Sequence, residues 1–256
     1  YADTTMGGYG LHINTSQGDT TNSAQVYNNM ILVRASLGTS TLSAGILHYE
    51  SSNINYYYNT VKMIGVDQNS PALCLFDVTS GVSNSIDLKN NIFTNFADGY
   101  VFFSQNVDET DFNNNYNDWY ANGSGDYISL GGTIISDLAG WQSATSDGAN
   151  SENINPYFPG GIDLHANNNI LNNLGTPITG ITDDIDGDSR DASNPDMGAD
   201  EFNASPYDIA LINVTSPQSG CGLTSSEDVI IQIKNVGTSS VSSIDATYDI
   251  ASTPSS

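Results

Sequence analysis

The stretch Ser85–Phe93 reads SIDLKNNIF, and it contains the two patterns that decide the fold. Ile86 and Leu88 alternate with two charged residues, which predicts a strand with one apolar face, because side chains of a strand point alternately to its two sides. An asparagine, Asn91, then precedes a short apolar pair. Asparagine is typical of turns, so we expect a second strand to begin directly after it.

The same two kinds of segment recur through the first 120 residues. Asn29, Asn59 and Asn91 each precede a mostly apolar pair, and Asn115 is a looser fourth member. A second class of short apolar segment recurs at a similar interval, as Gly10–Ile13, Gly45–His48, Ala72–Leu75 and Tyr100–Phe103. A shared period near 30 residues, with two or three short strands in each period, predicts a solenoid whose coils stack on one another.

We therefore predict an all-β fold, with a right-handed parallel β-helix as its main part. Four apolar residues should lie in consecutive coils of one sheet: Leu11, Ile46, Leu73 and Val101. Asn29, Asn59 and Asn91 should stack as a ladder, because the amide of an asparagine can bond the same residue one coil away. The alternative is that they are ordinary turn asparagines, which this Asn-rich composition would supply in any case.

The acidic stretch Ile181–Phe202, ITDDIDGDSRDASNPDMGADEF, follows the repeats. No apolar run interrupts it, so we expect a junction rather than a core element. It contains one cation, Arg190, among eight acids. Since arginine can bridge carboxylates, Arg190 should be held by acids of the same stretch, namely Asp196, Asp200 or Glu201.

Asp184, Asp186 and Asp188 occupy alternate positions of a turning backbone, as the oxygen ligands of Ca²⁺ sites often do. The spacing departs from the EF-hand loop, because Ser189 stands where the sharp-turn glycine belongs and Pro195 stands where the bidentate glutamate belongs. Two interpretations stay open. The three carboxylates form a Ca²⁺ loop of another type, or they cap the backbone amides of their own turn.

Acidic residues dominate the charge of this 256-residue chain, with 29 Asp and Glu against 5 Lys and Arg and a formal net charge of -24. Phosphate binding requires clustered Lys and Arg, so nucleic acid is excluded as a partner, and an anionic membrane surface is equally disfavoured. No apolar run reaches the ~18–20 residues that span a bilayer, so no membrane insertion is expected. The composition fits an extracellular setting that contains Ca²⁺.

The pattern changes after Phe202. Residues 208–216, 228–235 and 244–250 are predicted strands, longer than those of the repeats. Strands of this length favour the first part of an Ig-like β-sandwich over residues 204–256, after a β-helix over residues 1–203. Such a sandwich needs about 100 residues, so we expect it to continue for about 50 more. Cys221 has no plausible partner here, whereas Cys74, in an apolar run, should be a buried free thiol.

Three kinds of residue bear on a chemical function. Polysaccharide lyases need a cationic base and hydrolases need paired carboxylates, and neither pattern recurs at the coil period. His12, His48 and His165 have no cysteine or second histidine at metal-ligand spacing, which favours structural roles. Aromatic rings at Tyr116, Trp119 and Tyr120 could form a platform for sugar rings, although core packing accounts for most such residues.

Several segments carry a resemblance to known proteins: Asn90–Phe93, Tyr116–Tyr120, Asn155–Phe158 and Asp163–His165 resemble right-handed parallel β-helix proteins. Asp184–Arg190 followed by Pro195–Phe202 resembles the end of β-helix domains in large surface proteins of the Bacteroidota, and Asp208–Thr247 is similar to the Ig-like repeats that follow there.

The resemblance implies export by the type IX secretion system and display at the cell surface, as in gliding adhesins. The expected function is that of a non-enzymatic, adhesive or structural segment. Its partners would be an extracellular surface or glycan, or other segments of the same long chain. The alternative is a β-helix that binds or cleaves carbohydrate.

Overall fold

The computed structural model describes residues 2–3, 8–35, 43–66, 69–122, 127–217 and 226–247. By its contacts the chain divides into two units, Tyr1–Asn203 and Ala204–Ser256. Strands make up most of the regular structure in both. Each unit is described by itself.

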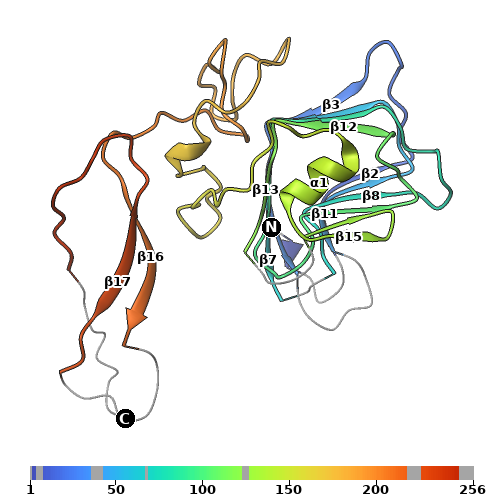
Figure 1. Cartoon of the computed structure of the whole chain (residues 1–256). Coiled ribbons are helices and arrows are strands. Elements are labelled where there is room, and N and C mark those ends of the chain that lie inside the picture. Colours follow the sequence, from blue (N-terminus) through green and yellow to red (C-terminus); the bar gives the residue numbers. More distant parts are fainter. Residues whose placement is uncertain are drawn as a thin grey trace. The chain divides into compact units, whose positions relative to one another are not determined.

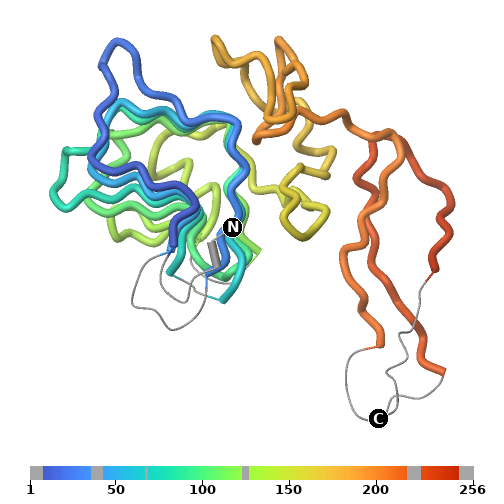
Figure 2. The backbone as a smooth tube through the Cα atoms, turned by 180° about the vertical axis from the view of Figure 1, so that it is seen from behind, coloured from blue at the N-terminus to red at the C-terminus, as the bar shows by residue number. Residues whose placement is uncertain are grey.

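The first unit is a β-solenoid whose coils pass in turn through three sheets, seen as stacked strands in Figure 1 and as stacked loops in Figure 2. Sheet 1 contains β1 (Ala2–Asp3), β4 (Met30–Ala35), β7 (Thr60–Gly65), β10 (Ile92–Asn95) and β13 (Asp118–Ala121). Sheet 2 contains β2 (Tyr9–Asn14), β5 (Ala44–Tyr49), β8 (Leu73–Phe76), β11 (Phe102–Gln105), β14 (Ile128–Leu130) and β15 (Thr133–Ile135). Sheet 3 contains β3 (Ala24–Tyr27), β6 (Ile54–Tyr57), β9 (Ile86–Lys89) and β12 (Phe112–Asn115).

Neighbouring strands in these sheets are parallel, except for the antiparallel pair β14–β15. The predicted all-β parallel solenoid is therefore confirmed. Ile86 and Leu88 are fully buried while Asp87 between them is half-buried, as the alternation predicted. Apolar side chains of this kind from all three sheets meet in one continuous core.

The predicted register of sheet 2 is correct for three coils and wrong for the fourth. Leu11 lies opposite Ile46, and Ile46 lies opposite Leu73, but the residue opposite Leu73 is Phe102 rather than Val101. The ring of Phe102 enters the core, where it contacts Phe112 at 5.4 Å between ring centroids. Val101, which directly precedes β11, is fully buried as well, so both apolar residues lie in the core and Phe102 is the one in the strand.

Helix α1 (Leu138–Thr145) lies over the space that the three sheets enclose (Figure 1). Its N-cap is Asp137, whose Oδ1 accepts from the amide of Gly140 at 2.7 Å. Trp141 is the fully buried residue of the helix, and it packs on the rings at this end of the core. The helix therefore caps the solenoid after its last coil.

An asparagine ladder follows one corner of the solenoid, where sheet 3 leads into sheet 1. Asn29 donates from Nδ2 to Asn59 Oδ1 at 2.8 Å, Asn59 donates to Asn91 at 2.9 Å, and Asn91 donates to Asn117 at 2.8 Å. The fourth member is Asn117, not Asn115. Asn115 ends β12, and its Oδ1 accepts from Asn150 instead.

The left-handed turn of this corner is made by the residue before each ladder asparagine, rather than by the asparagine itself. These four corner residues have φ between 52° and 57°: Asn28, Tyr58, Asn90 and Tyr116. Asparagine adopts this conformation readily, but tyrosine does so rarely. The two corner tyrosines therefore require support from surrounding structure.

The second unit contains an antiparallel pair, β16 (Ile209–Ser216) and β17 (Ile230–Asn235). Residues 244–247, the described part of the third expected strand, are not in a strand, and residues 248–250 lie outside the described residues. A separate Ig-like sandwich is thus not shown. Cys221 also lies outside the described residues, while Cys74 is a buried free thiol whose pKa burial raises to about 12.

Candidate functional site

Residues 168–202, here called the strap, pack against the four corner residues. Asn28 donates to the carbonyl of Asp183 at 2.7 Å, and Asn90 donates to that of Thr176 at 2.7 Å. Tyr116 packs in an apolar cluster with Ile92, Ala166, Leu171 and Met197. The acidic stretch was expected to be a junction outside the core. Instead, Met197 and Ala199 are fully buried, and the strap crosses several coils.

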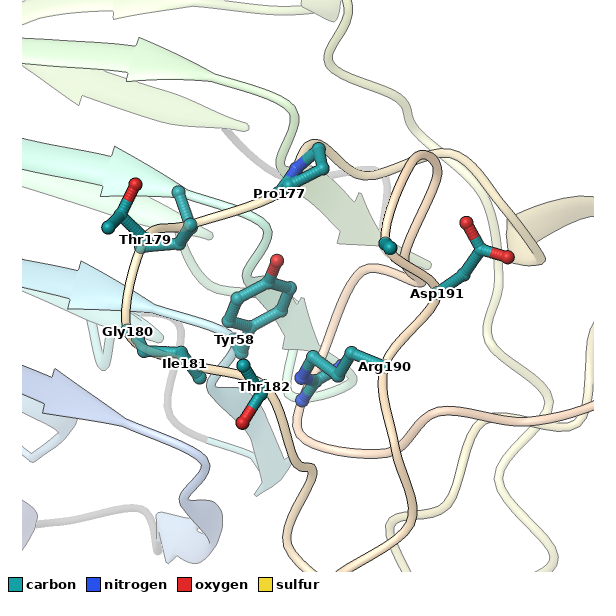
Figure 3. A pocket seen from close by; sticks show the side chains of 10 residues that line it. Tyr58, Pro177, Thr179, Gly180, Ile181, Thr182, Arg190 and Asp191 are labelled. Atoms are coloured by element: carbon teal, nitrogen blue, oxygen red, sulfur yellow. The ribbon is translucent and has the colours of Figure 1, made fainter.

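Arg190 anchors the strap to the second coil (Figure 3). Its guanidinium lies over the ring of Tyr58 at 3.9 Å and pairs with Glu201 at 3.3 Å. The same group donates to Asn28 Oδ1 and to the carbonyls of Gly198 and Ala199, each at 3.0 Å. Only 2% of this side chain is exposed. Of the three acids proposed as its partners, the structure brings Glu201 to Arg190.

Most of the strap's buried carboxylates accept backbone amides. Asp184 accepts from Asp186 and Asp188 at 2.9 and 2.8 Å with one oxygen, and from Glu201 at 2.9 Å with the other. These are the contacts of a capped turn. Asp188 itself is exposed, and Asp186 is directed at a histidine, so the three carboxylates do not share one centre among the described residues.

His165, which precedes the strap, lies between two carboxylates. Its Nδ1 is 2.5 Å from Asp163 Oδ1, and its Nε2 is 2.8 Å from Asp186 Oδ2. A third carboxylate, that of Asp200, lies close enough that one ligand atom each of His165, Asp186 and Asp200 falls within 4.8 Å of the others. The hydrogen bonds to Asp163 and Asp186 raise the pKa of His165 to about 9. This is the described group that could hold a metal ion.

A cavity of about 250 Å³ lies beside Tyr58 and Arg190 (Figure 3). The loop Pro177–Thr182 forms one side of it, and Asp191 lies on the other. Nη1 and Nη2 of Arg190 already bond groups of the strap and corner, whereas the buried Nε has no hydrogen-bond partner among the described residues. The cavity is smaller than the ~300–1,000 Å³ of typical small-molecule pockets.

The three aromatic residues proposed as a sugar platform do not share one surface. Trp119 is fully buried and stacks on Phe93 at 4.7 Å, because its position in β13 points into the solenoid. Tyr116 packs under the strap. Tyr120 points to the outer side of sheet 1, where its hydroxyl accepts from Asn155 at 3.1 Å.

The other two histidines, His12 and His48, lie at different positions of their paired strands. In the paired strands His12 lies opposite Leu47, and His48 lies opposite Ile13. His48 therefore points into the core, where it bonds the hydroxyl of Tyr56 at 2.8 Å, while His12 is exposed.

Replacing Gly198 tests the attachment of the strap. Gly198 has φ of +93°, and an added Cβ would lie 2.7 Å from Ile92 Cδ1 and 2.8 Å from Thr60 Oγ1. Gly198→Ala should lower the free energy of unfolding by about 3 kcal/mol, through backbone strain and overpacking together. Chemical denaturation measures the change. The matched control is Gly180→Ala, since Gly180 has φ of +91° with nothing within 4 Å. Equal losses of unfolding free energy in the two variants would show that close packing of Gly198 against the solenoid does not contribute to stability.

Ionisation of Asp196 should make the free energy of unfolding depend on pH. The residue is fully buried, and this burial raises its pKa to about 7, against the opposing effect of amide hydrogen bonds from Asn173 and Phe202. A raised carboxylate pKa means that ionisation in the folded state is costly. Stability should therefore fall as the pH rises from about 5 to 7, by about 2 kcal/mol from this group, and should level off above pH 7.

Denaturant titrations at several pH values measure this slope, which Asp196→Asn should reduce. Asp188→Asn removes the same charge from an exposed position and should leave the slope unchanged. A slope that is the same in all three proteins would assign the pH dependence to other groups.

Sequence reasoning missed the group around His165. Its members are 14 to 35 residues apart, so no short motif contains them. The available signal was the pair Asp163 and His165, two positions apart beside an acid-rich stretch, because carboxylate–histidine pairs often orient metal ligands.

Comparison of the chain with protein-family models, with curated proteins and with solved structures finds no significant match. In the part of the chain that is described, no helix is both long and apolar enough to cross a bilayer.

Proposed function

We propose that this chain is a rigid, non-enzymatic segment of a large secreted cell-surface protein, an adhesin or surface filament. The observation that carries the proposal is the strap. Its buried arginine and most of its buried carboxylates bond the solenoid or the strap itself, which is the arrangement of a structural reinforcement.

The charge and composition support an extracellular setting. A net charge of -24 keeps a chain soluble and disfavours contact with polyanions. A polyuronate substrate would therefore be repelled. Of the solenoid's lysines, Lys89 is paired with Asp87 at 2.8 Å, and Lys62 lies between two aromatic rings, so neither is placed as a base.

Cell-surface protease treatment tests the proposal. In intact cells of the source organism, added protease should release peptides of this chain before any cytoplasmic marker is released. A strain that lacks the chain should attach less well to surfaces. Recovery of the peptides only after lysis, or unchanged attachment, would contradict the proposal.

Glycan binding is a second candidate function, supported by one surface. On the outer side of sheet 1, the Lys62 amine lies 5.3 Å from the ring centre of Phe96 and 5.0 Å from that of Phe158. Tyr120 adjoins Phe96 at 5.6 Å. Half-exposed rings of this kind can stack on sugars. A glycan array with the wild-type chain and Phe158→Ala tests it, and the absence of any signal that depends on Phe158 would remove it.

A further inference from the structure

We propose that His165, Asp186 and Asp200 form a binding site for a first-row divalent transition-metal ion, with zinc as the reference ion. The site is independent of the proposed adhesive function. It also differs from the Ca²⁺ loop considered for Asp184, Asp186 and Asp188, since it shares one residue with that loop and adds a nitrogen ligand.

The geometry brings three distant segments to one point. Asp186 lies in the first turn of the acidic stretch and Asp200 near its end, and the backbone bond from Ile185 to Ala199 at 3.0 Å holds these two segments together. His165 comes from the preceding loop. His165 Nε2 and Asp186 Oδ2 are 2.8 Å apart, and all three ligand atoms lie within 4.8 Å of one another, a range that includes the ~3.3 Å between ligands of a tetrahedral zinc ion with bonds near 2.0 Å.

The carboxylates of Asp186 and Asp200 differ from those of the other strap acids in the hydrogen bonds that they accept. Asp184, Asp191, Asp196 and Glu201 all accept backbone amides. Among the described residues, no backbone amide donates to the carboxylate of Asp186 or Asp200. Within the described ranges, the partner of the Asp186 carboxylate is the His165 ring. These two acids are therefore free of the turn-capping role and remain available as ligands.

Asp163 supplies the support that metal-binding histidines usually have. Its Oδ1 is 2.5 Å from His165 Nδ1, so it accepts the Nδ1 proton and leaves Nε2 directed at Asp186. A carboxylate on the far nitrogen fixes the ring and its tautomer in this way in many metal sites. Because the side chains of His165 and Asp186 are 42% and 55% exposed, the ion has access from solvent and room for water ligands.

The ligand set selects the class of ion. One imidazole and two carboxylates suit zinc and its neighbours in the first transition row, whereas Ca²⁺ takes six to eight oxygen ligands. An ion here would join three segments of the strap region and neutralise two facing carboxylates.

Isothermal titration of the whole chain, after chelator treatment and dialysis, tests the site with ZnCl₂ and separately with CaCl₂. We expect one equivalent of zinc to bind, with little heat from calcium. His165→Ala should abolish this binding, and Asp163→Asn should weaken it about tenfold through loss of ring orientation. Both side chains altered in these tests are partly exposed, and circular dichroism checks that each variant is folded.

Two control variants define the outcomes that overturn the proposal. Asp188→Asn and His12→Ala alter an exposed acid of the same stretch and the other exposed histidine, and both should bind zinc as the wild type does. No zinc binding, or binding unchanged in His165→Ala, would refute the site. Calcium binding that is lost in Asp188→Asn would assign the acidic turn to calcium instead.

Discussion

Asn91→Ala is expected to lower the free energy of unfolding of the first unit by about 4 kcal/mol. The Asn91 amide donates to Asn117, to Tyr56 and to Lys89, and its oxygen accepts both the backbone and the side-chain amide of Asn59. Alanine removes all five bonds and leaves buried donors and acceptors without partners, at about 1–3 kcal/mol for each group. Urea denaturation followed by tryptophan fluorescence measures the loss.

Asn29→Ala is the matched control for this prediction. Asn29 is the first member of the ladder and is partly exposed, so water can replace its lost bonds. We expect a loss of about 1 kcal/mol. Similar losses at the two positions would show that the ladder contributes no more than separate turn asparagines.

Trp141→Ala is expected to cost about 4 kcal/mol, within the range for removal of a buried tryptophan. The ring of Trp141 stacks on Phe112 at 5.8 Å and contacts Phe102 at 5.0 Å and Trp119 at 6.0 Å. Its loss would leave a cavity at the end of the core and expose the last coil. Thermal unfolding should begin at a lower temperature, and hydrogen exchange should quicken in β11 and β12 first.

Trp141→Phe separates ring packing from hydrogen bonding. The Nε1 of Trp141 is buried and has no hydrogen-bond partner in the described part of the chain, so phenylalanine removes no bond seen there and fills most of the space. We expect a loss below about 1.5 kcal/mol. A loss as large as that of the alanine variant would mean that a phenyl ring cannot replace the indole, so that the cap depends on the full contact area of Trp141.

The sequence predicted the parallel solenoid because period and alternation are properties of the chain itself. It did not predict the register at Phe102, because Val101 and Phe102 are both apolar and both fully buried, so the apolar pattern does not distinguish them. The inward position of Trp119 was missed for a similar reason. The sequence of a strand does not show which face of the sheet an aromatic side chain occupies until the pairing register is known.

The packing of the strap against the solenoid was not predicted, for a different reason. Its contacts join residues more than 80 positions apart, and its polar composition is that of an exposed loop. Arg190 was correctly placed among its neighbouring acids, since the lone cation of an acidic stretch has few other partners. Its stacking on Tyr58 required the corner tyrosine to adopt a left-handed conformation, which no propensity argument would assign.

The strap changes how the solenoid should unfold. In a simple solenoid each coil touches only its neighbours, so the ends fray while the middle stays folded. Here Asn28 in the first described coil bonds Asp183 and Arg190, which are 155 and 162 positions later, and Asn90, two coils further on, bonds the same strap at Thr176. Loss of the first coil would loosen the strap from its neighbours as well. The unit should therefore melt in one cooperative transition instead of coil by coil.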